Sequence, residues 1–594
     1  MGLFLSKKEA AGDNHYEGNA ILRMLAYMKP YLTTFLFCIL LVLAITGLEL
    51  YKPILIGDAI DRYILSDGPV DARFAGILKA SAYYLCVLLV LFVFNRAQYL
   101  MLQTMGQKII YRVRQEVFEH ILSLTMRFFD NTPVGKLVTR VTNDVEALNE
   151  MYSNILVKLF RNICMVFGIA VMMLVLNVRM ALYSFVLVPF VIVLTWLFKN
   201  ISRKAYQLTK TRVTALNTFL SENISGMRLI QIFVREKEKH RDFCARSREL
   251  YQANFRELMV FAIFRPSIVF CYSAALVIVL IAGGNEVLRG TISMGTLYVF
   301  INYVKSFFQP IQDLAEQLST LQSAVASAEK ICTILDVKPL IQDPEKPVEL
   351  TDIKGRIEFQ NVWFAYDGEN YVLRDVSFVI EPGMSVAFVG ATGAGKSSIL
   401  NLIGRYYDIQ KGRILIDGVD IRDLDRKKLR AAIGQVQQDV FIFTGDVRSN
   451  IRLRDEEISD EAVREAAKYV NADRFIDGLE HGYEEEVAER GATFSAGQRQ
   501  LLSFARTLAH NPGILILDEA TANIDTETEQ WIQDGLAKLM QGRTTILVAH
   551  RLSTIQHADK IIVMHKGKIR ESGTHRELLE QNGIYKKLYE LQLS

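Results

Sequence analysis

Cysteine and charge are both scarce in this chain, and each scarcity excludes a class of protein. The six cysteines are scattered, four of them inside apolar runs, without the spacing of a disulfide framework or a zinc site. We therefore expect reduced thiols that pack in the core. Only 22% of the residues are charged and the net charge is +3, so no nucleic-acid partner is expected.

Apolar residues, by contrast, are abundant. They make up 50% of the 594 residues, and the mean hydropathy is +0.17. That composition excludes a disordered chain and is too apolar for an ordinary soluble enzyme. The length indicates more than one domain. The segment Met1–Tyr31 is polar and carries Lys7, Lys8, Arg23 and Lys29, so no cleavable signal peptide is expected there.

The apolar residues are concentrated in six uncharged windows, all before residue 330. Each window, with its weakly polar flanks, reaches the roughly 20 residues that a membrane-spanning helix needs. The sequence therefore predicts six membrane spans, at 32–56, 76–103, 155–178, 180–200, 260–285 and 290–315.

Lysine and arginine are unevenly distributed between the segments that join these spans. The segments after the second and the fourth span are rich in both, whereas Asp61–Asp71 is mainly acidic. Because basic loops stay in the cytoplasm, both termini and the two basic segments are expected there. The basic segments keep a helical apolar period, so the flanking spans should continue as helices beyond the bilayer. Ahead of the first span, Ile21, Leu22, Leu25 and Met28 predict an amphipathic helix on the inner membrane surface.

Three charged residues lie inside or beside predicted spans. Lys305 is expected either to line an internal cavity or to reach the cytoplasmic leaflet. For Glu49 and Arg265, a position at a membrane interface is the better explanation.

The composition changes after the last span. Pro339, Pro344 and Pro347 lie in a charged stretch that cannot continue a helix, which predicts a linker over 331–352. Beyond it, short apolar strands alternate with helices. The sequence thus predicts an α-helical transmembrane domain over 1–330, followed by an α/β domain over 353–594.

A glycine-rich loop carries the strongest chemical signal in the α/β domain. Residues 390–397, Gly-Ala-Thr-Gly-Ala-Gly-Lys-Ser, fit the phosphate-binding loop pattern between an apolar strand and a helix. The glycines let backbone N–H groups wrap the phosphates, Lys396 adds a positive charge, and Ser397 is a Mg²⁺ ligand. The predicted nucleotide-binding residues of this loop are Gly390, Thr392, Gly393, Ala394, Gly395, Lys396, Ser397 and Ser398.

Two further strands end in residues suited to phosphate chemistry. Gly513–Glu519 is an apolar run that would deliver two carboxylates to the edge of a sheet. There, Asp518 can hold Mg²⁺ and Glu519 can accept a proton from the attacking water. The strand Thr544–Ala549 ends in His550, which is placed to reach the γ-phosphate, although a lone histidine at a strand end is more often structural.

The segment Phe494–Gln498 precedes a helix and permits two interpretations. Ser495, with Gln498 three residues on, is a helix capping box. The same geometry would aim a helix N-terminus, through Ser495, Gly497 and Gln498, at a phosphate across a dimer interface.

In combination, these motifs resemble those of an ATP-binding-cassette (ABC) exporter half-transporter of the multidrug type. The resemblance covers nearly the whole chain. Gly390–Ser398 is similar to the Walker A motif and Leu517–Glu519 to Walker B. Phe494–Gln498 stands where the family has the signature Leu-Ser-Gly-Gly-Gln.

The resemblance also implies roles that the residues alone do not. Ala522–Asp525 looks like the D-loop, His550 matches the switch histidine, and Gln438 matches the Q-loop glutamine. Tyr366 matches the aromatic residue that stacks on adenine, with a strand-packing tyrosine as the alternative. ATP and Mg²⁺ are then the implied cofactors. The implied catalytic residues are Glu519, His550 and Gln438, with Asp525 at the nucleotide and Mg²⁺ held by Ser397, Gln438 and Asp518.

Two segments of the membrane half resemble the intracellular coupling segments of the family. These are Phe128–Leu137 and Ser221–Arg228, and they are expected to dock near Gln438. The family completes each ATP site with the signature of a second subunit, so the resemblance implies a dimer. Because Phe494 and Ala496 depart from the signature, we expect a heterodimer with a second half-transporter rather than a homodimer. This chain would be the subunit that keeps the catalytic glutamate.

The expected function is ATP-driven export of hydrophobic small molecules, drug-like or lipid-like, by alternating access. The protein would be a multi-pass component of the plasma (inner) membrane and would contact the lipid bilayer. A homodimeric lipid flippase, a peptide exporter, an importer with an exporter fold and an ATP-gated channel stay open as alternatives.

Overall fold

The computed structural model describes residues 20, 22–348, 350, 353–518, 526–548 and 555–593. The chain divides into two compact units. The first comprises the chain up to Leu122 together with Val134–Val337, and the second comprises Ser123–Pro133 and the chain from Lys338 onward. Within the described ranges the first unit is helical and the second is α/β, which confirms the predicted fold class.

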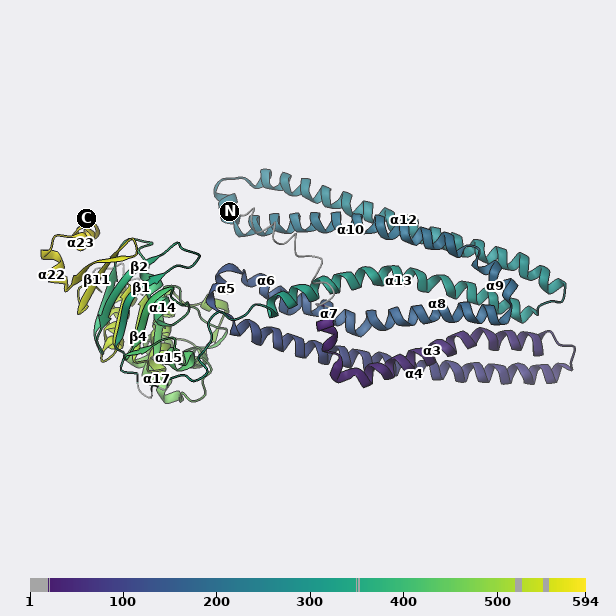
Figure 1. Cartoon of the computed structure of the whole chain (residues 1–594), viewed down its shortest axis with the longest axis horizontal. Helices are drawn as coiled ribbons and strands as arrows, with labels where there is room; N and C mark the ends of the chain where they lie inside the picture. Colours follow the sequence, from purple (N-terminus) through teal and green to yellow (C-terminus); the bar gives the residue numbers. More distant parts are fainter. Residues whose placement is uncertain are drawn as a thin grey trace. The chain divides into compact units, whose positions relative to one another are not determined.

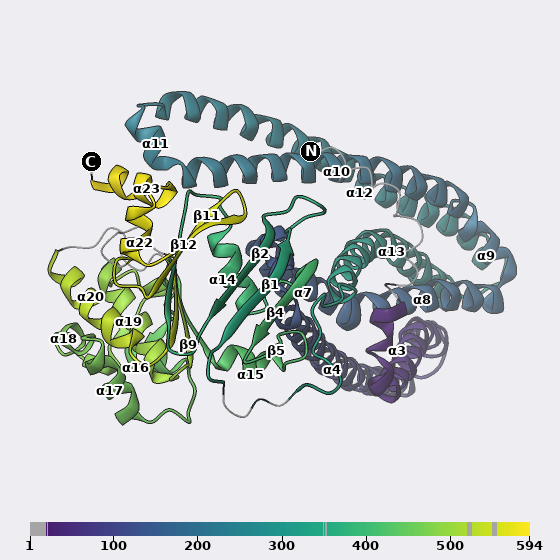
Figure 2. The same ribbon diagram turned by 60° about the vertical axis from the view of Figure 1, so that its left-hand side comes forward.

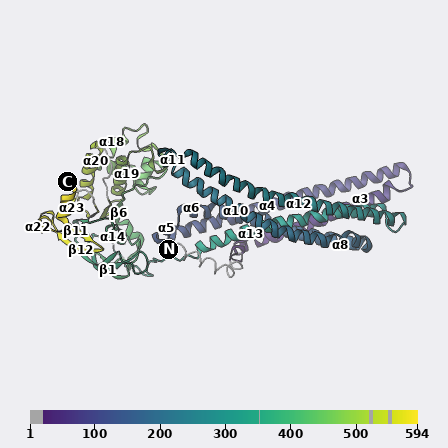
Figure 3. The ribbon, with the colours of Figure 1, turned by 90° about the horizontal axis from the view of Figure 1, so that it is seen from above.

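Long helices dominate the first unit. Figure 1 shows α10 beside α12, and α13 beside α8, and the view from above in Figure 3 agrees. The helices of this unit are η1 (Lys29–Tyr31), α3 (Leu32–Ala59), η2 (Ile60–Ile64), α4 (Val70–Ser123), α6 (Val134–Thr139), η3 (Arg140–Asp144), α7 (Val145–Glu150), η4 (Met151–Ile155), α8 (Leu156–Leu176), α9 (Val178–Phe185), α10 (Val188–Ser225), α11 (Met227–Ile232), α12 (Glu236–Leu288) and α13 (Met294–Leu335).

Five helical stretches in the described part of the chain are long and apolar enough to cross a membrane. They are Lys29–Ile64, Val70–Ser123, Val134–Leu176, Val178–Ser225 and Glu236–Leu288. These stretches contain four of the first five predicted spans in full, and the third, 155–178, up to Leu176. The sixth predicted span falls largely in α13, whose apolar start gives way to polar residues from Gln309 onward. The crossing by α13 therefore stays a prediction.

Two of these helices are much longer than a bilayer is thick. Helix α4 has 54 residues and α12 has 53. At about 1.5 Å per residue, each is roughly 80 Å long, against about 30 Å for the hydrocarbon layer. The expectation that helices continue beyond the bilayer is confirmed.

An ion pair joins two helices inside the first unit. The Arg161 guanidinium of α8 donates to Glu49 of α3, with Nη2 3.1 Å from Oε1. Charges within a span are costly unless they are paired. The charge of Glu49 is thus compensated by Arg161, and the interface position expected for Glu49 stays a prediction. Lys305 is exposed on α13, so both interpretations of it stay open.

The short helix before α3 packs against protein. Met24 and Met28 are buried, and the Tyr152 hydroxyl donates to the Met24 carbonyl oxygen at 2.7 Å. Leu22, in contrast, is 67% exposed. The apolar stripe expected to face the membrane is therefore divided between a buried side and an exposed side.

All six cysteines are free thiols. Cys38, Cys271 and Cys332 are buried, as expected of core-packing residues, whereas Cys86 and Cys244 are exposed. The prediction of core packing is therefore confirmed for three of the six cysteines.

The second unit is built on two large sheets and a short two-stranded one. The four-stranded sheet has the order β2-β1-β4-β5, and the six-stranded sheet has the order β12-β11-β3-β10-β9-β6. The strands are β1 (Ile357–Phe364), β2 (Leu373–Ile380), β3 (Ser385–Val389), β4 (Lys411–Ile416), β5 (Val419–Asp420), β6 (Ile433–Val436), β7 (Gly445–Asp446), β8 (Glu486–Val487), β9 (Ile514–Asp518), β10 (Thr544–Val548), β11 (Lys560–His565) and β12 (Lys568–Gly573).

Helices cover the six-stranded sheet. Figure 2 shows α14 between the two large sheets, with α19 and α20 on the other side of the six-stranded one. The helices of this unit are α5 (Met126–Asn131), α14 (Lys396–Ile403), α15 (Arg426–Ala431), α16 (Val447–Arg452), α17 (Asp460–Tyr469), α18 (Asp473–Ile476), η5 (Gly482–Glu484), η6 (Glu489–Gly491), α19 (Ala496–Ala509), α20 (Thr526–Met540), α22 (His575–Glu580) and α23 (Ile584–Leu593).

The central strands bury both of their faces. In β3, Val386 and Phe388 join the core that holds α14, while Ala387 and Val389 join the core that holds α19. Strand β9 alternates in the same way. Because side chains alternate across a strand, a continuous apolar run is what a doubly covered parallel strand requires.

The segment after α13 is anchored to the second unit. Helix α13 extends to Leu335, so residues 331–335 of the predicted linker are helical. The buried Arg405 donates to the Gln342 carbonyl oxygen at 3.2 Å, and Arg426 pairs with Asp343 at 2.7 Å. These two arginines attach the segment between α13 and β1 to the second unit.

The contact between α3 and α13 gives a test of the first unit. A Cβ added at Gly295 would overlap the carbonyl oxygen of Gly57, so Gly295→Ala must push the two helices apart. Overpacking of this kind costs about 1–3 kcal/mol, more than the gain of up to about 1 kcal/mol from alanine in a helix. We expect a lower thermal unfolding temperature for the detergent-purified protein.

The matched control for that substitution is Gly284→Ala in α12. A Cβ at Gly284 meets nothing within 4 Å, so this variant should be as stable as the parent or slightly more stable. Equal gains from both alanines would contradict a tight crossing of α3 and α13.

Candidate functional site

The parallel strands of the six-stranded sheet end at one common edge. Val548 at the end of β10 lies opposite Phe388 of β3 and opposite Asp518 of β9. Val436 at the end of β6 lies opposite Leu517. The loop that follows β3, the Asp518 carboxylate and Gln438, which follows β6, therefore emerge from the same edge. The structure thus brings these three predicted elements together.

The loop after β3 leaves no room for a side chain at two of its glycines. Gly390 and Gly395 have φ angles of 153° and 103°, which favour glycine. A Cβ at Gly390 would overlap the Met564 carbonyl oxygen, and one at Gly395 would lie 2.6 Å from Leu373 Cδ2. The loop leads directly into α14, whose first residue is Lys396. Exposed N–H groups at such a helix start attract anions, so the cradle suits phosphate.

Lys396 is held under this loop. Its side chain is buried, at 7% exposure, and Nζ donates to the carbonyl oxygens of Gly390 at 2.7 Å and Ala391 at 3.2 Å. A buried ammonium group needs such acceptors. The positive charge is therefore held inside the cradle. Ser397, the next residue, is exposed.

Tyr366 lies beside the start of α14 although it follows a strand of the other sheet. Its hydroxyl is 3.1 Å from the Ser398 Oγ. Its ring makes edge contacts with Phe364 and Tyr407, at centroid distances of 4.8 and 5.1 Å. The position fits both earlier interpretations, because the ring packs at the end of β1 and also borders the phosphate loop.

A magnesium ion fits this edge only together with phosphate oxygens. Among the described residues, no group of three or more His, Cys, Asp or Glu side chains could hold a metal by itself. Mg²⁺ is usually bound by one or two carboxylates with substrate phosphates and water. The half-buried Asp518 with the exposed Ser397 and Gln438 supplies a donor set of that kind.

The predicted signature turn is a capping box in the structure. Ser495 Oγ accepts from the Gln498 N–H at 3.2 Å, and Gln498 Oε1 accepts from the Ser495 N–H at 2.9 Å. Phe494 is buried against Phe475, with ring centroids 6.0 Å apart, whereas Ser495 and Ala496 are exposed. The capping interpretation is confirmed, and the exposed start of α19 is compatible with phosphate binding as well.

Three predicted site residues, Glu519, Asp525 and His550, lie outside the described residues. The same holds for the rest of the predicted D-loop. Their assigned roles stay predictions.

The first predicted coupling segment, Phe128–Leu137, is divided: its start belongs to α5 in the second unit, and Val134–Leu137 belongs to α6 in the first unit. Arg127 pairs with Asp367 at 3.1 Å, and the Tyr407 hydroxyl donates to the Asp130 carboxylate. Burial, together with this hydrogen bond, raises the pKa of Tyr407. Sequence reasoning did not assign Tyr407 or Asp367, and the only available signal was that Asp367 adjoins Tyr366.

Two families match this chain. Residues 35–311 match the family described as ABC transporter transmembrane region, and residues 373–522 match the family described as ABC transporter. The first match covers the long helices, and the second covers the phosphate loop, the signature turn and Asp518.

Similar proteins align over most of the chain. It is 37% identical over 574 residues to the uncharacterized ABC transporter ATP-binding protein YknV of Bacillus subtilis, covering 96% of this chain and 94% of that one. It is 40% identical over 510 residues to the probable multidrug resistance ABC transporter ATP-binding/permease protein YheH of the same organism, covering 84% and 74%. It is 34% identical over 560 residues to an ATP-dependent lipid A-core flippase of Desulfotalea psychrophila, covering 94% and 96%.

The geometry of Lys396 leads to a direct test of the phosphate loop. Lys396→Ala removes the positive charge that the loop encloses, so nucleotide affinity should fall by at least about tenfold, as expected for losing a charge-assisted contact of roughly 1.5–3 kcal/mol. A fluorescent ATP analogue titrated against the purified protein would measure this. Lys427→Ala, which removes an exposed lysine of α15, should leave the affinity unchanged. Equal affinities for all three proteins would contradict the assignment.

Proposed function

The chain belongs to the ABC transporter family, and we propose that it exports hydrophobic small molecules, drug-like or lipid-like, as one half of a dimer. ABC ATP-binding domains hydrolyse ATP to drive transport, so the chain is an ATP hydrolase. The observation that carries the proposal of export is the similarity to a probable multidrug resistance protein over 84% of this chain.

The proposed ATP site uses the carboxyl edge of the six-stranded sheet. The loop from Gly390 to Ser398 binds the phosphates, with Lys396 supplying positive charge. Bound Mg²⁺, held by Ser397, Gln438 and Asp518, would neutralise negative charge on the phosphate oxygens. Tyr366 stacks on adenine, Glu519 accepts a proton from the attacking water, and His550 contacts the γ-phosphate. The remaining assigned nucleotide contacts are Thr392, Gly393, Ala394, Gly395 and Asp525 in this chain, and Ser495, Gly497 and Gln498 facing a partner's nucleotide.

The proposed transport cycle links this edge to the membrane helices through α5. ATP binding closes two ATP-binding domains, α5 follows that motion, and the long helices turn the cavity outward. Hydrolysis then resets the dimer. The contacts of Arg127 and Asp130 with Asp367 and Tyr407 support this role, because they attach α5 next to Tyr366.

The proposed partner is a different half-transporter. In the signature turn, the Phe494 side chain is accommodated in the core, so Ala496 is the change that a phosphate would meet. A methyl group at this position separates backbone from phosphate and weakens the grip. In a heterodimer the partner supplies an intact signature to this chain's Glu519, and Ala496 faces the weaker site.

A homodimeric lipid flippase is the second candidate. The observation in its favour is the similarity to a lipid A-core flippase over 94% of this chain and 96% of that protein. In a homodimer, Ala496 would face the nucleotide in both ATP sites, so ATP hydrolysis would have to proceed despite its methyl group.

The proposed location is the plasma (inner) membrane, with both termini in the cytoplasm. Two features support this orientation: the basic segments after the second and fourth spans, and an ATP-binding domain that needs cytoplasmic ATP. The membrane spans themselves make this a multi-pass membrane protein.

ATPase activity of the chain purified alone in lipid tests the partnership. We expect slow turnover that rises at least about tenfold when the second half-transporter is co-expressed, because only then does an intact signature face Glu519. Glu519→Gln should abolish the fast turnover while ATP binding persists, and Glu465→Gln on the exposed face of α17 should have no effect.

Fast turnover by the single chain, abolished by Glu519→Gln, would instead identify a homodimer. Undiminished turnover in Glu519→Gln would refute the assignment of Glu519 as the general base.

The attachment of α5 makes a separate prediction about coupling. Tyr407→Phe removes the hydroxyl that donates to Asp130, at a cost of about 1 kcal/mol, which corresponds to roughly fivefold. We expect transport per ATP hydrolysed to fall by that factor while ATP affinity stays unchanged. Tyr406→Phe is the matched control, since the Arg430 guanidinium still stacks on the ring. If both variants transport equally well per ATP, Tyr407 has no part in coupling.

A further inference from the structure

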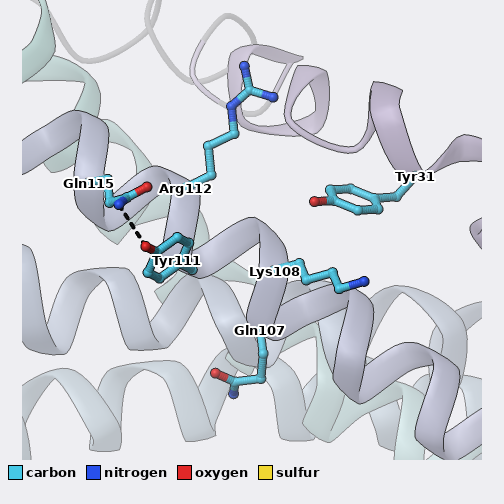
Figure 4. A pocket seen from close by; sticks show the side chains of 6 residues that line it. All are labelled: Tyr31, Gln107, Lys108, Tyr111, Arg112 and Gln115. Carbon is cyan, nitrogen blue, oxygen red and sulfur yellow. Dashed lines mark hydrogen bonds between the residues drawn. The ribbon is translucent and has the colours of Figure 1, made fainter.

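An open hollow lies in the first unit beside the start of α3. Its volume is about 670 Å³, and Figure 4 shows the side chains around it. Lys108 and Arg112 extend from successive turns of α4, and Tyr31 faces them from η1. The lining residues are Tyr31, Gln107, Lys108, Tyr111, Arg112 and Gln115.

The two cations of this hollow lack an acidic partner. Within the ranges that the structure describes, no ion pair or side-chain hydrogen bond involves Lys108 or Arg112. Neighbouring charges are compensated. Arg114 pairs with Glu146 at 3.9 Å. The Tyr27 hydroxyl donates to the Glu116 carboxylate, and burial together with this bond raises the pKa of Tyr27. The hollow therefore has two positive charges in its lining that pair with no acidic side chain in the described part of the chain.

Neutral donors complete the polar lining. Gln115 Nε2 donates to the Tyr111 hydroxyl oxygen at 2.8 Å, so the hydroxyl hydrogen of Tyr111 stays available for another acceptor. Tyr31 offers a second hydroxyl group. Two cations with phenol donors form a donor-rich site, which matches an anion with several oxygens, such as a phosphate group.

The position of the hollow along the helices matches a lipid headgroup layer. Tyr31 immediately precedes α3, the helix of the first span, and Lys108 lies just beyond the second predicted span, 76–103. At about 1.5 Å per residue, Lys108 lies roughly 7.5 Å past the end of that span, within the headgroup region. Tyrosine at this level is typical of membrane interfaces.

Exposed apolar side chains continue from the hollow toward the membrane centre. Leu32 and Leu36 of α3 are 51% and 57% exposed, and Leu100 of α4 is 43% exposed. The apolar stretch of α4 is only 6% buried within this chain, against 17–28% for the other four candidate spans. An acyl chain attached to a headgroup in the hollow would meet these side chains.

From this arrangement, we propose that the hollow binds the phosphate headgroup of an anionic lipid from the cytoplasmic leaflet. Lys108 and Arg112 neutralise the headgroup, Tyr31 and Tyr111 donate to its oxygens, and α3 and α4 contact its acyl chains. The site is separate from the ATP site and does not depend on which cargo is transported. It rests on the proposed cytoplasmic orientation of this end of α4.

Photolabelling in vesicles tests the proposal on the full-length transporter, assembled with its partner subunit if it needs one. The probes are photoreactive phosphatidylglycerol and photoreactive phosphatidylcholine, and the measurement is the label on the peptides that carry Tyr31 and Tyr111. We expect phosphatidylglycerol to label these peptides far more than phosphatidylcholine. The double variant Lys108→Gln/Arg112→Gln should lose roughly 30-fold in apparent affinity, given about fivefold per juxtamembrane cation.

Helix α10 offers a matched control pair. Lys199 and Arg203 have the same residue types and spacing, are exposed, and lie at the cytoplasmic end of the fourth predicted span, but they line no part of the hollow. Lys199→Gln/Arg203→Gln should leave the label on the Tyr31 and Tyr111 peptides unchanged. If both double variants lose the label equally, general surface charge causes the labelling, and the proposal is overturned.

Three other outcomes would also overturn it. Competition by millimolar inorganic phosphate would indicate a site for a soluble anion. A lower dimer fraction of Lys108→Gln/Arg112→Gln on size exclusion would mean that a second subunit covers this face. Label arising only from the monolayer opposite the ATP-accessible face would refute the orientation. Because labelling needs neither hydrolysis nor cargo, a failure of the export proposal alone would leave the expected labelling intact.

Discussion

A peptide backbone that crosses a bilayer finds no water to bond with, and this constraint governs the whole first unit. Every crossing segment has to satisfy its own N–H and C=O groups, so it has to be a continuous helix. Once formed, helices such as α4 and α12 continue well past the hydrocarbon layer. The chain passes from the end of α4 at Ser123 to α5 at Met126 almost at once, and α5 is part of the second unit. The membrane helix and the ATP-binding unit are thereby joined through a short, structured connection.

The second unit meets a different constraint, which is to gather residues from distant parts of the chain around one anion. Parallel strands accomplish this because their carboxyl ends share an edge, and strand register decides which residues arrive there. Asp518 lies opposite Val548, and Leu517 lies opposite Val436, so the loops after β6, β9 and β10 open at the same level. The alternation of buried residues in β3 and β9 locks this register, since a shift by one residue would exchange their two cores.

The parts of the structure that local sequence determines could be predicted, and those that depend on distant pairs could not. The phosphate loop, its flanking strand and helix, and the long helices of the first unit follow from composition and spacing. The capping box at Ser495 was equally readable, because its partners lie three residues apart. The ion pair of Glu49 with Arg161 and the bond of Tyr407 to Asp130 join residues that are 112 and 277 positions apart. No local pattern marks such pairs, so the sequence predicts neither the partner of Glu49 nor that of Tyr407.

The structure separates two substitutions in the signature turn that the sequence alone treats alike. By sequence, Phe494 and Ala496 count equally as departures from the family pattern. In the structure, Phe494 packs against Phe475 in the core, where a larger apolar residue replaces a smaller one without reaching the surface. Ala496 is exposed at the first turn of α19, where any phosphate would have to approach the backbone. The two substitutions therefore have separate physical meanings, core packing for one and phosphate access for the other. Of the two substitutions, the one exposed at the start of α19 therefore amounts to a single methyl group.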